Sequence, residues 1–228
     1  MLDIAFAAAA AVVAFAFCLC TWERWLARHR PHDLAWTVAL ALFTVAAFAL
    51  AWGAGVGWDE PTYKVFYFFG AIANVPILAL GTIYLLCSRR TADLAAVAVG
   101  LIVAFAGGVM LMTPLTGAIP RDRLVAGSEV LGLLPRIFAG GFSGLASLVV
   151  VGGALWSAWR IRRGRLVVAN ALIATGTLVT GASGLLNSVF DEMLGFSITL
   201  LAGISVIFCG FLVATSGRFR PGGGGAFP

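Results

Sequence analysis

The chain has 228 residues, of which 61% are hydrophobic and only 11% are charged. Soluble globular domains carry roughly 25% charged residues, so this composition excludes a soluble fold and predicts helices that turn apolar sides to lipid. The formal net charge of +5 lies in short polar connections, which indicates contact with the anionic headgroups of a lipid bilayer and excludes a nucleic-acid partner.

Seven apolar stretches approach the roughly 20 residues that a helix needs to cross a bilayer. In chain order they cover 3–21, 34–55, 63–87, 93–113, 137–158, 166–186 and 195–216. The predicted fold class is therefore all-α, a polytopic membrane protein with seven transmembrane helices over 1–217. The glycine-rich segment 218–228 has nothing to pack and is expected to be a disordered tail.

Basic residues predict the orientation of these spans. Eleven occupy the connections after the first, third and fifth spans and the tail, whereas four occupy the opposite side. Because the richer side is cytoplasmic, we expect an external N-terminus and a cytoplasmic C-terminus in the cell membrane. Asp3 precedes the first span and arginines follow it, which is typical of a retained anchor and not of a cleaved signal peptide.

The third span contains the first candidate for ligand binding. Asn74 lies near its middle and Pro76 follows two residues later. Proline removes a backbone donor and frees a carbonyl, so this segment is the expected helix break. Asn74 and Pro76 would serve as a ligand contact and a hinge, or as an inter-helix hydrogen bond beside a harmless kink.

The later spans contain small and polar residues at helical spacing. Between spans four and five, the loop 116–135 is expected to hold a short interfacial helix or a simple connector. In the fifth span, Gly140-x-x-x-Gly144 is typical of close helix packing. In the sixth, Asn170 and Thr177 lie on one side, as ligand contacts or as packing residues.

Two acidic pairs lie at the predicted external ends, Asp59-Glu60 and Asp191-Glu192. They would bind a cation or a cationic ligand, or act as solvated caps of the helices that follow.

Titratable residues are missing from the centre of every predicted span, and His29 and His32 occupy the first cytoplasmic connection. Proton-coupled carriers and haem proteins usually need such groups within the membrane. No catalytic residues, metal site or cofactor are therefore predicted, and we expect no enzymatic activity.

Spans one to three match spans five to seven at an offset of about 132 residues. The matching positions are Asp59-Glu60 with Asp191-Glu192 and, after a two-residue adjustment, Trp22-x-x-Trp25 with Trp156-x-x-Trp159. A duplication would give repeats 1–90 and 136–218 around a linker helix 93–113, related by a twofold axis along the membrane normal. Alternatively, the matches reflect the general preference of tryptophans and acids for membrane interfaces.

This arrangement resembles the SWEET and PQ-loop transporters, which share the span count, the external N-terminus and the central inverting helix. The chain is also similar to seven-span membrane proteins of high-GC bacteria. The first resemblance implies a three-plus-one-plus-three architecture, and the second implies no activity.

Two functions follow from these observations. The first is a non-catalytic integral membrane protein, acting as a binding or sensor protein or as an accessory subunit of a larger membrane complex. The alternative is a transporter or channel-like protein for a neutral small solute or a lipid. Apart from the bilayer, a membrane-protein partner or a homo-oligomer is expected.

Overall fold

The computed structural model describes residues 2–161, 164–190 and 193–215, apart from the side chains of 161, 182–190 and 215. The regular elements of this part of the chain are all helices, with no strand among the described residues, and seven helices are long and apolar enough to cross a membrane. Asp191, Glu192 and the tail 218–228 lie outside the described residues.

The third and fifth spans each combine two α-helical parts around a π-helical part, whereas the others are single helices. In chain order the elements are α1 (Leu2–Arg28), α2 (Pro31–Val56), α3 (Glu60–Tyr67), η1 (Phe68–Ala73), α4 (Asn74–Leu86), α5 (Arg89–Met112), α6 (Gly127–Val130), α7 (Leu133–Ile137), η2 (Phe138–Phe142), α8 (Ser143–Ile161), α9 (Gly164–Phe190) and α10 (Met193–Thr215).

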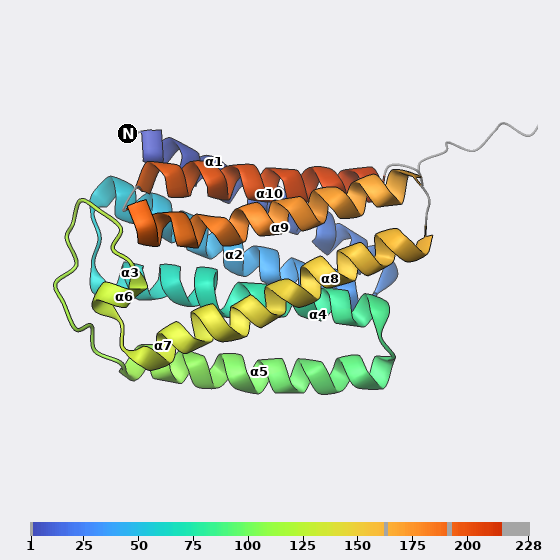
Figure 1. The fold of residues 1–228 in the computed structure, drawn as a ribbon, viewed down its shortest axis with the longest axis horizontal. Helices are drawn as coiled ribbons and strands as arrows, with labels where there is room; N and C mark the ends of the chain where they lie inside the picture. Colours follow the sequence, from blue (N-terminus) through green and yellow to red (C-terminus); the bar gives the residue numbers. More distant parts are fainter. Residues whose placement is uncertain (1, 162–163, 191–192, 216–228) are drawn as a thin grey trace, which may run out of the picture.

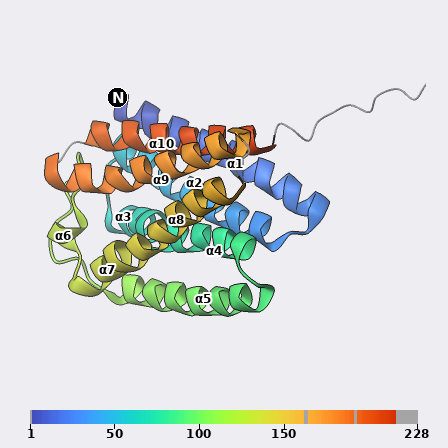
Figure 2. The same cartoon turned by 45° about the vertical axis from the view of Figure 1, so that its right-hand side comes forward.

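Six spans pack in a closed order, and α5 lies outside it (Figure 1). Each neighbours the next in the sequence α1, α2, α4, α8, α9 and α10, and α10 returns to α1. α5 packs against α4, η1 and α7 at the edge of the bundle, which Figure 2 shows from a second side. The C-terminal ends of α1, α4 and α8 lie at one end of the bundle, called here the arginine-rich end because Arg28, Arg89 and Arg160 occur there.

Glycines bring α9 and α10 into close contact. A Cβ atom added to Gly176 would lie 2.7 Å from the carbonyl oxygen of Gly203, and one added to Gly210 would lie 2.8 Å from that of Ala169. Such distances are too short for any side chain, so the two backbones pack directly on each other. The packing interpretation of span six therefore holds at Gly176.

The connection between α5 and α7 folds over the end of the bundle opposite the arginine-rich end. Its apolar residues Leu124, Val125, Val130 and Leu131 are buried in the main core, and Tyr63 donates a hydrogen bond to the carbonyl oxygen of Val125 at 3.2 Å. The expectation of an interfacial helix is wrong, because the helix in this connection, α6, has four residues and the apolar side chains of the connection turn inward.

Candidate functional site

A charged residue is completely buried at the arginine-rich end. Asp33 has 0% of its side chain exposed and lies in the first turn of α2, which begins at Pro31. Proline at this position has no N–H that would need a partner, and a carboxylate in the first turn suits the positive end of the helix dipole. The predicted second span began one residue later, so the sequence reasoning missed Asp33.

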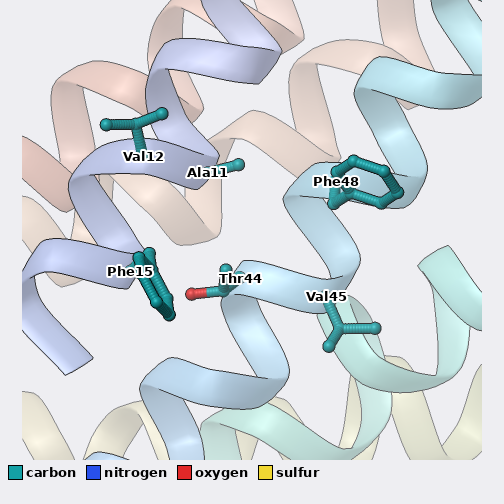
Figure 3. Close-up of a pocket in the computed structure, with 6 residues that line it drawn as sticks. All are labelled: Ala11, Val12, Phe15, Thr44, Val45 and Phe48. Atoms are coloured by element: carbon teal, nitrogen blue, oxygen red, sulfur yellow. The ribbon is translucent and has the colours of Figure 1, made fainter. Parts of the chain in front are cut away.

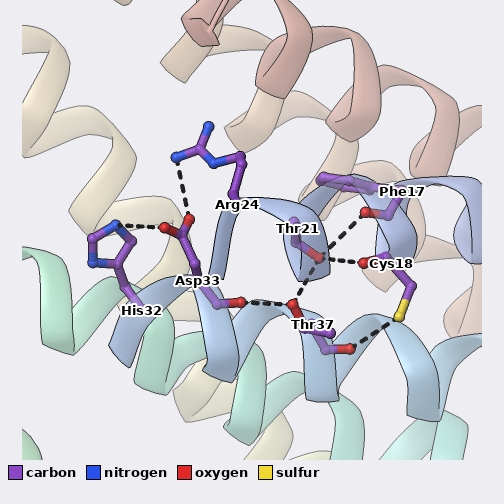
Figure 4. Close-up of polar contacts among 7 residues, drawn as sticks. All are labelled: Phe17, Cys18, Thr21, Arg24, His32, Asp33 and Thr37. Carbon is purple, nitrogen blue, oxygen red and sulfur yellow. Dashed lines mark hydrogen bonds and ion pairs between the residues drawn. The ribbon is translucent and has the colours of Figure 1, made fainter. Parts of the chain in front are cut away.

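Two cationic or ionisable side chains face this carboxylate (Figure 4). Nη2 of Arg24, from α1, lies 3.1 Å from Oδ1 of Asp33, and Nε2 of His32 lies 3.7 Å from Oδ2. Neither oxygen of Asp33 makes a hydrogen bond to a described residue. Charge attraction therefore holds the carboxylate, as is required of a charge removed from water.

The same arginine reaches a third helix. Its guanidinium carbon lies 4.8 Å from the centre of the Phe211 ring on α10, a distance at which a cation is attracted to an aromatic face. Arg24 thus connects α1 with α2 by charge and with α10 through the ring. These three helices are consecutive in the closed order of six.

Hydroxyl groups extend this cluster along α1 and α2, away from the arginine-rich end (Figure 4). The hydroxyl of Thr37 donates to the carbonyl oxygen of Asp33 at 2.8 Å, and its oxygen lies 3.0 Å from that of Thr21. Cys18 donates to the carbonyl oxygen of Thr37 at 3.4 Å. The cluster therefore fastens α1 to α2 over several turns, and it presents no nucleophile–base pair of the kind that covalent catalysis needs.

The residues of the predicted helix break, Asn74 and Pro76, lie in the first turn of α4, and the irregular segment is the π-helix η1 that ends directly before them at Ala73. Pro76 cannot donate to the carbonyl oxygen four residues earlier, on Ile72. Ser143 of α8 bonds at this point, with its hydroxyl 2.7 Å from the Ala71 oxygen and 3.3 Å from the Ile72 oxygen. Ser143 is a functional contact that sequence reasoning missed, because one serine in an apolar span carries no distinctive signal.

Asn74 itself is buried, with 6% of its surface exposed. Its amide has no hydrogen-bond partner among the residues that the structure describes. An amide in this setting favours a polar ligand or water as a partner, because leaving it unsatisfied costs several kcal/mol in an apolar environment.

The other intramembrane candidates contact neighbouring or local groups. Asn170 donates to the hydroxyl of Ser157 on α8 at 3.0 Å. Thr177 is buried and bonds back to the carbonyl oxygen of Ile173 at 2.8 Å. Asn170 thus joins α9 to α8, while Asn74 lies on α4, and no contact in the described chain brings the two amides together.

The acidic candidates at the end opposite the arginine-rich end act as local partners. Asp59 caps α3 by accepting a hydrogen bond from the Thr62 amide at 2.9 Å, and the hydrogen bonds from Thr62 lower its pKa below the usual value. Glu60 pairs with Lys64 at 2.8 Å. Both acids border a hollow of about 290 Å³ whose other wall is the segment 115–119. Their predicted counterparts Asp191 and Glu192 lie outside the described residues.

An apolar hollow of about 390 Å³ opens between the middles of α1 and α2 (Figure 3). Its walls are Ala11, Val12, Phe15, Thr44, Val45 and Phe48. The Thr44 hydroxyl is bonded to its own helix at 2.8 Å, so this hollow offers no free polar contact. Neither of the two hollows is lined by Asn74 or Asn170.

The metal-binding possibilities are equally limited within the described residues. No three histidine, cysteine, aspartate or glutamate side chains gather there in a way that could hold a metal ion.

Comparison with protein-family models, curated proteins and solved structures finds no match to this chain.

Proposed function

We propose that the protein is a non-catalytic integral membrane protein that acts as an accessory subunit of a larger membrane complex or as a binding or sensor protein. The observation that supports the accessory role is a row of open glycines on the fifth span. At Gly140, Gly144 and Gly152, no described atom beyond the adjoining residues and backbone of the same helix lies within 4 Å of the position that a Cβ would take. The row repeats at intervals of four or eight residues, so it follows one helix face.

These glycines differ from those that hold the bundle together. Gly176 and Gly210 are in contact with the neighbouring helix, whereas the fifth-span row faces outward. Small residues let transmembrane helices approach closely, and within lipid this packing is a main source of association energy. The predicted GxxxG contact at Gly140 and Gly144 is thus not made inside the described chain. The proposed occupant is a transmembrane helix of a partner protein.

Mass spectrometry of the protein released in its native lipid tests this role. The unmodified protein, called here the parent, is expected to carry a stoichiometric protein partner. The double variant Gly144→Leu/Gly152→Leu is expected to lose that partner. Because the space at both positions is open, the fold should survive, and an unchanged thermal unfolding temperature checks this. Val12→Leu, at an exposed position of α1, is the matched control and should retain the partner.

The results separate the alternatives. A parent chain that carries no protein, or a double variant that keeps its partner, would reject the proposed docking row. A second copy of the chain in place of a partner would make the row a homo-oligomer contact instead.

The second candidate is a transporter or channel-like protein for a neutral small solute or a lipid. It is favoured by one observation, the buried Asn74 amide without a described partner, next to the break at η1. A small molecule retained by the parent and lost in Asn74→Leu would support this reading over the first.

The orientation and the internal repeat are further parts of the proposal. The excess of arginine at one end supports an external N-terminus and a cytoplasmic C-terminus in the cell membrane. The closed helix order supports the repeat: exchanging α1 with α8, α2 with α9 and α4 with α10 maps every neighbouring pair onto another neighbouring pair. A twofold axis along the membrane normal would have this effect, with α5 as the linker.

A further inference from the structure

The three side chains of the buried charge cluster, Arg24, His32 and Asp33, differ in their exposure to solvent. The side chain of Asp33 is 0% exposed, that of His32 is 12% exposed and that of Arg24 is 23% exposed. Both neighbours of the carboxylate, His32 and Arg24, are therefore partly exposed to solvent, whereas the carboxylate is not. A proton arriving from that solvent meets the imidazole before it meets Asp33.

We propose that His32 is a proton-operated switch of the contact between α1, α2 and α10. With a neutral imidazole, Arg24 and Asp33 form a balanced buried pair. A proton bound by His32 adds a second positive charge next to the Asp33 carboxylate, which Arg24 already neutralises. The charged imidazole gains more from water than from the cluster, so it turns outward and the contact loosens.

Removal of the imidazole from water is the largest effect that opposes a positive charge on His32, and the surrounding charges act in addition to it. Arg24 from α1 and Arg30 from the preceding turn both oppose a positive charge on His32, while Asp33 favours it. The attraction to Asp33 acts over 3.7 Å and is shared with Arg24 at 3.1 Å. The described parts of α4 and α10 contribute no charged residue, and α4 has one titratable tyrosine, Tyr84, near this end. The remaining charged residues at the described ends of α5, α8 and α9 are Arg89, Arg90, Asp93, Arg160 and Arg165, and none of them is among the charges that act on His32.

The switch would act on helices that are otherwise distant in the chain. Arg24 is tied to Asp33 on α2 and to Phe211 on α10, and the Thr21 and Thr37 hydroxyls continue the connection inward. Loosening the Arg24–Asp33 contact therefore frees α1 from both neighbours at this end. Histidine suits such a role because its ordinary pKa of about 6.5 lies within the physiological range.

Hydrogen exchange of the full chain in lipid nanodiscs tests the proposal. Protection factors, which are corrected for the intrinsic effect of pH on exchange, are measured for peptides covering 21–37 at about pH 7.5 and about pH 5.5, on either side of the ordinary histidine pKa. Protection in the parent is expected to fall about tenfold at the lower pH. It should not change in His32→Gln, whereas His29→Gln, at an exposed histidine, should respond like the parent.

Three results would overturn the switch. The first is equal protection of the parent at both pH values, which needs no variant and so does not depend on any variant folding. The second is a full pH response in His32→Gln or in His32→Phe, since neither side chain takes up a proton in this range. Protection that rises at the lower pH would also reject the proposal, because it would mean that the protonated imidazole tightens the cluster.

Discussion

Ser143 shows at the residue scale how a break in a membrane helix is stabilised. Pro76 leaves the carbonyl oxygen of Ile72 without its helical donor, and water is not available inside a bilayer to replace it. The Ser143 hydroxyl on α8 supplies a donor to this carbonyl and to that of Ala71. The irregular segment of one span is therefore stabilised by a side chain of another.

Replacing Ser143 with alanine is expected to lower the free energy of unfolding by about 1–3 kcal/mol, because buried carbonyl groups lose their donor. Reversible unfolding in mixed micelles measures the change. Ser147→Ala is the control, since that hydroxyl only bonds back to the carbonyl oxygen of Ser143 on its own helix. Equal effects of the two variants would show that the bond between the helices contributes nothing specific.

At the scale of elements, the contact between α9 and α10 depends on the absence of side chains. Gly176 faces both Ile207 and the carbonyl oxygen of Gly203. On the same helix, Gly181 has open space around it. The two glycines therefore differ in packing while sharing their backbone conformation and their helix.

We expect Gly176→Ala to destabilise the protein by about 1–3 kcal/mol, the usual cost of overpacking. Gly181→Ala should instead be neutral or stabilising by up to about 1 kcal/mol, because alanine is the better helix former. Thermal unfolding followed by circular dichroism compares them. A Gly176→Ala variant as stable as the parent would mean that the two helices separate without cost.

At the scale of the whole molecule, the unequal distribution of arginines predicts the orientation in the membrane. A reporter enzyme fused after Arg218 should be active only in the cytoplasm, and one fused at the N-terminus only outside. A third fusion after Arg123, in the connection between α5 and α7, should behave like the N-terminal one. An active external reporter at Arg218 would contradict the charge argument.

The number and order of the spans were predictable because an apolar run long enough to cross a bilayer is visible without knowledge of the partners. The charge cluster was not, since the burial of Asp33 results from the packing of α1 against α2. In the sequence, Asp33 directly precedes an apolar stretch, where a charged residue indicates the solvent-exposed end of a helix. Its burial depends on Arg24, which lies beyond the predicted end of the first span.

The breaks in the helices were predictable in part. Pro76 indicated the position of η1, because proline has a local and known effect on a helix. No proline follows the π-helix η2 within α8 in the way that Pro76 follows η1. The bond from Ser143 to Ala71 joins residues far apart in sequence, and a single chain offers no local pattern that would reveal it.

The π-helix η1 also alters how the two halves of the chain should be compared. A π turn holds about one residue more than an α turn, so it behaves as a local insertion. α10, the proposed counterpart of this span, is a continuous α-helix. Beyond Ala73, the numbering offset between the halves should therefore decrease by about one residue. An offset of 132 residues aligns Asn74 with Val206, whereas the reduced offset aligns it with Ser205. If the two halves arose by duplication, this position would therefore hold a polar side chain in both.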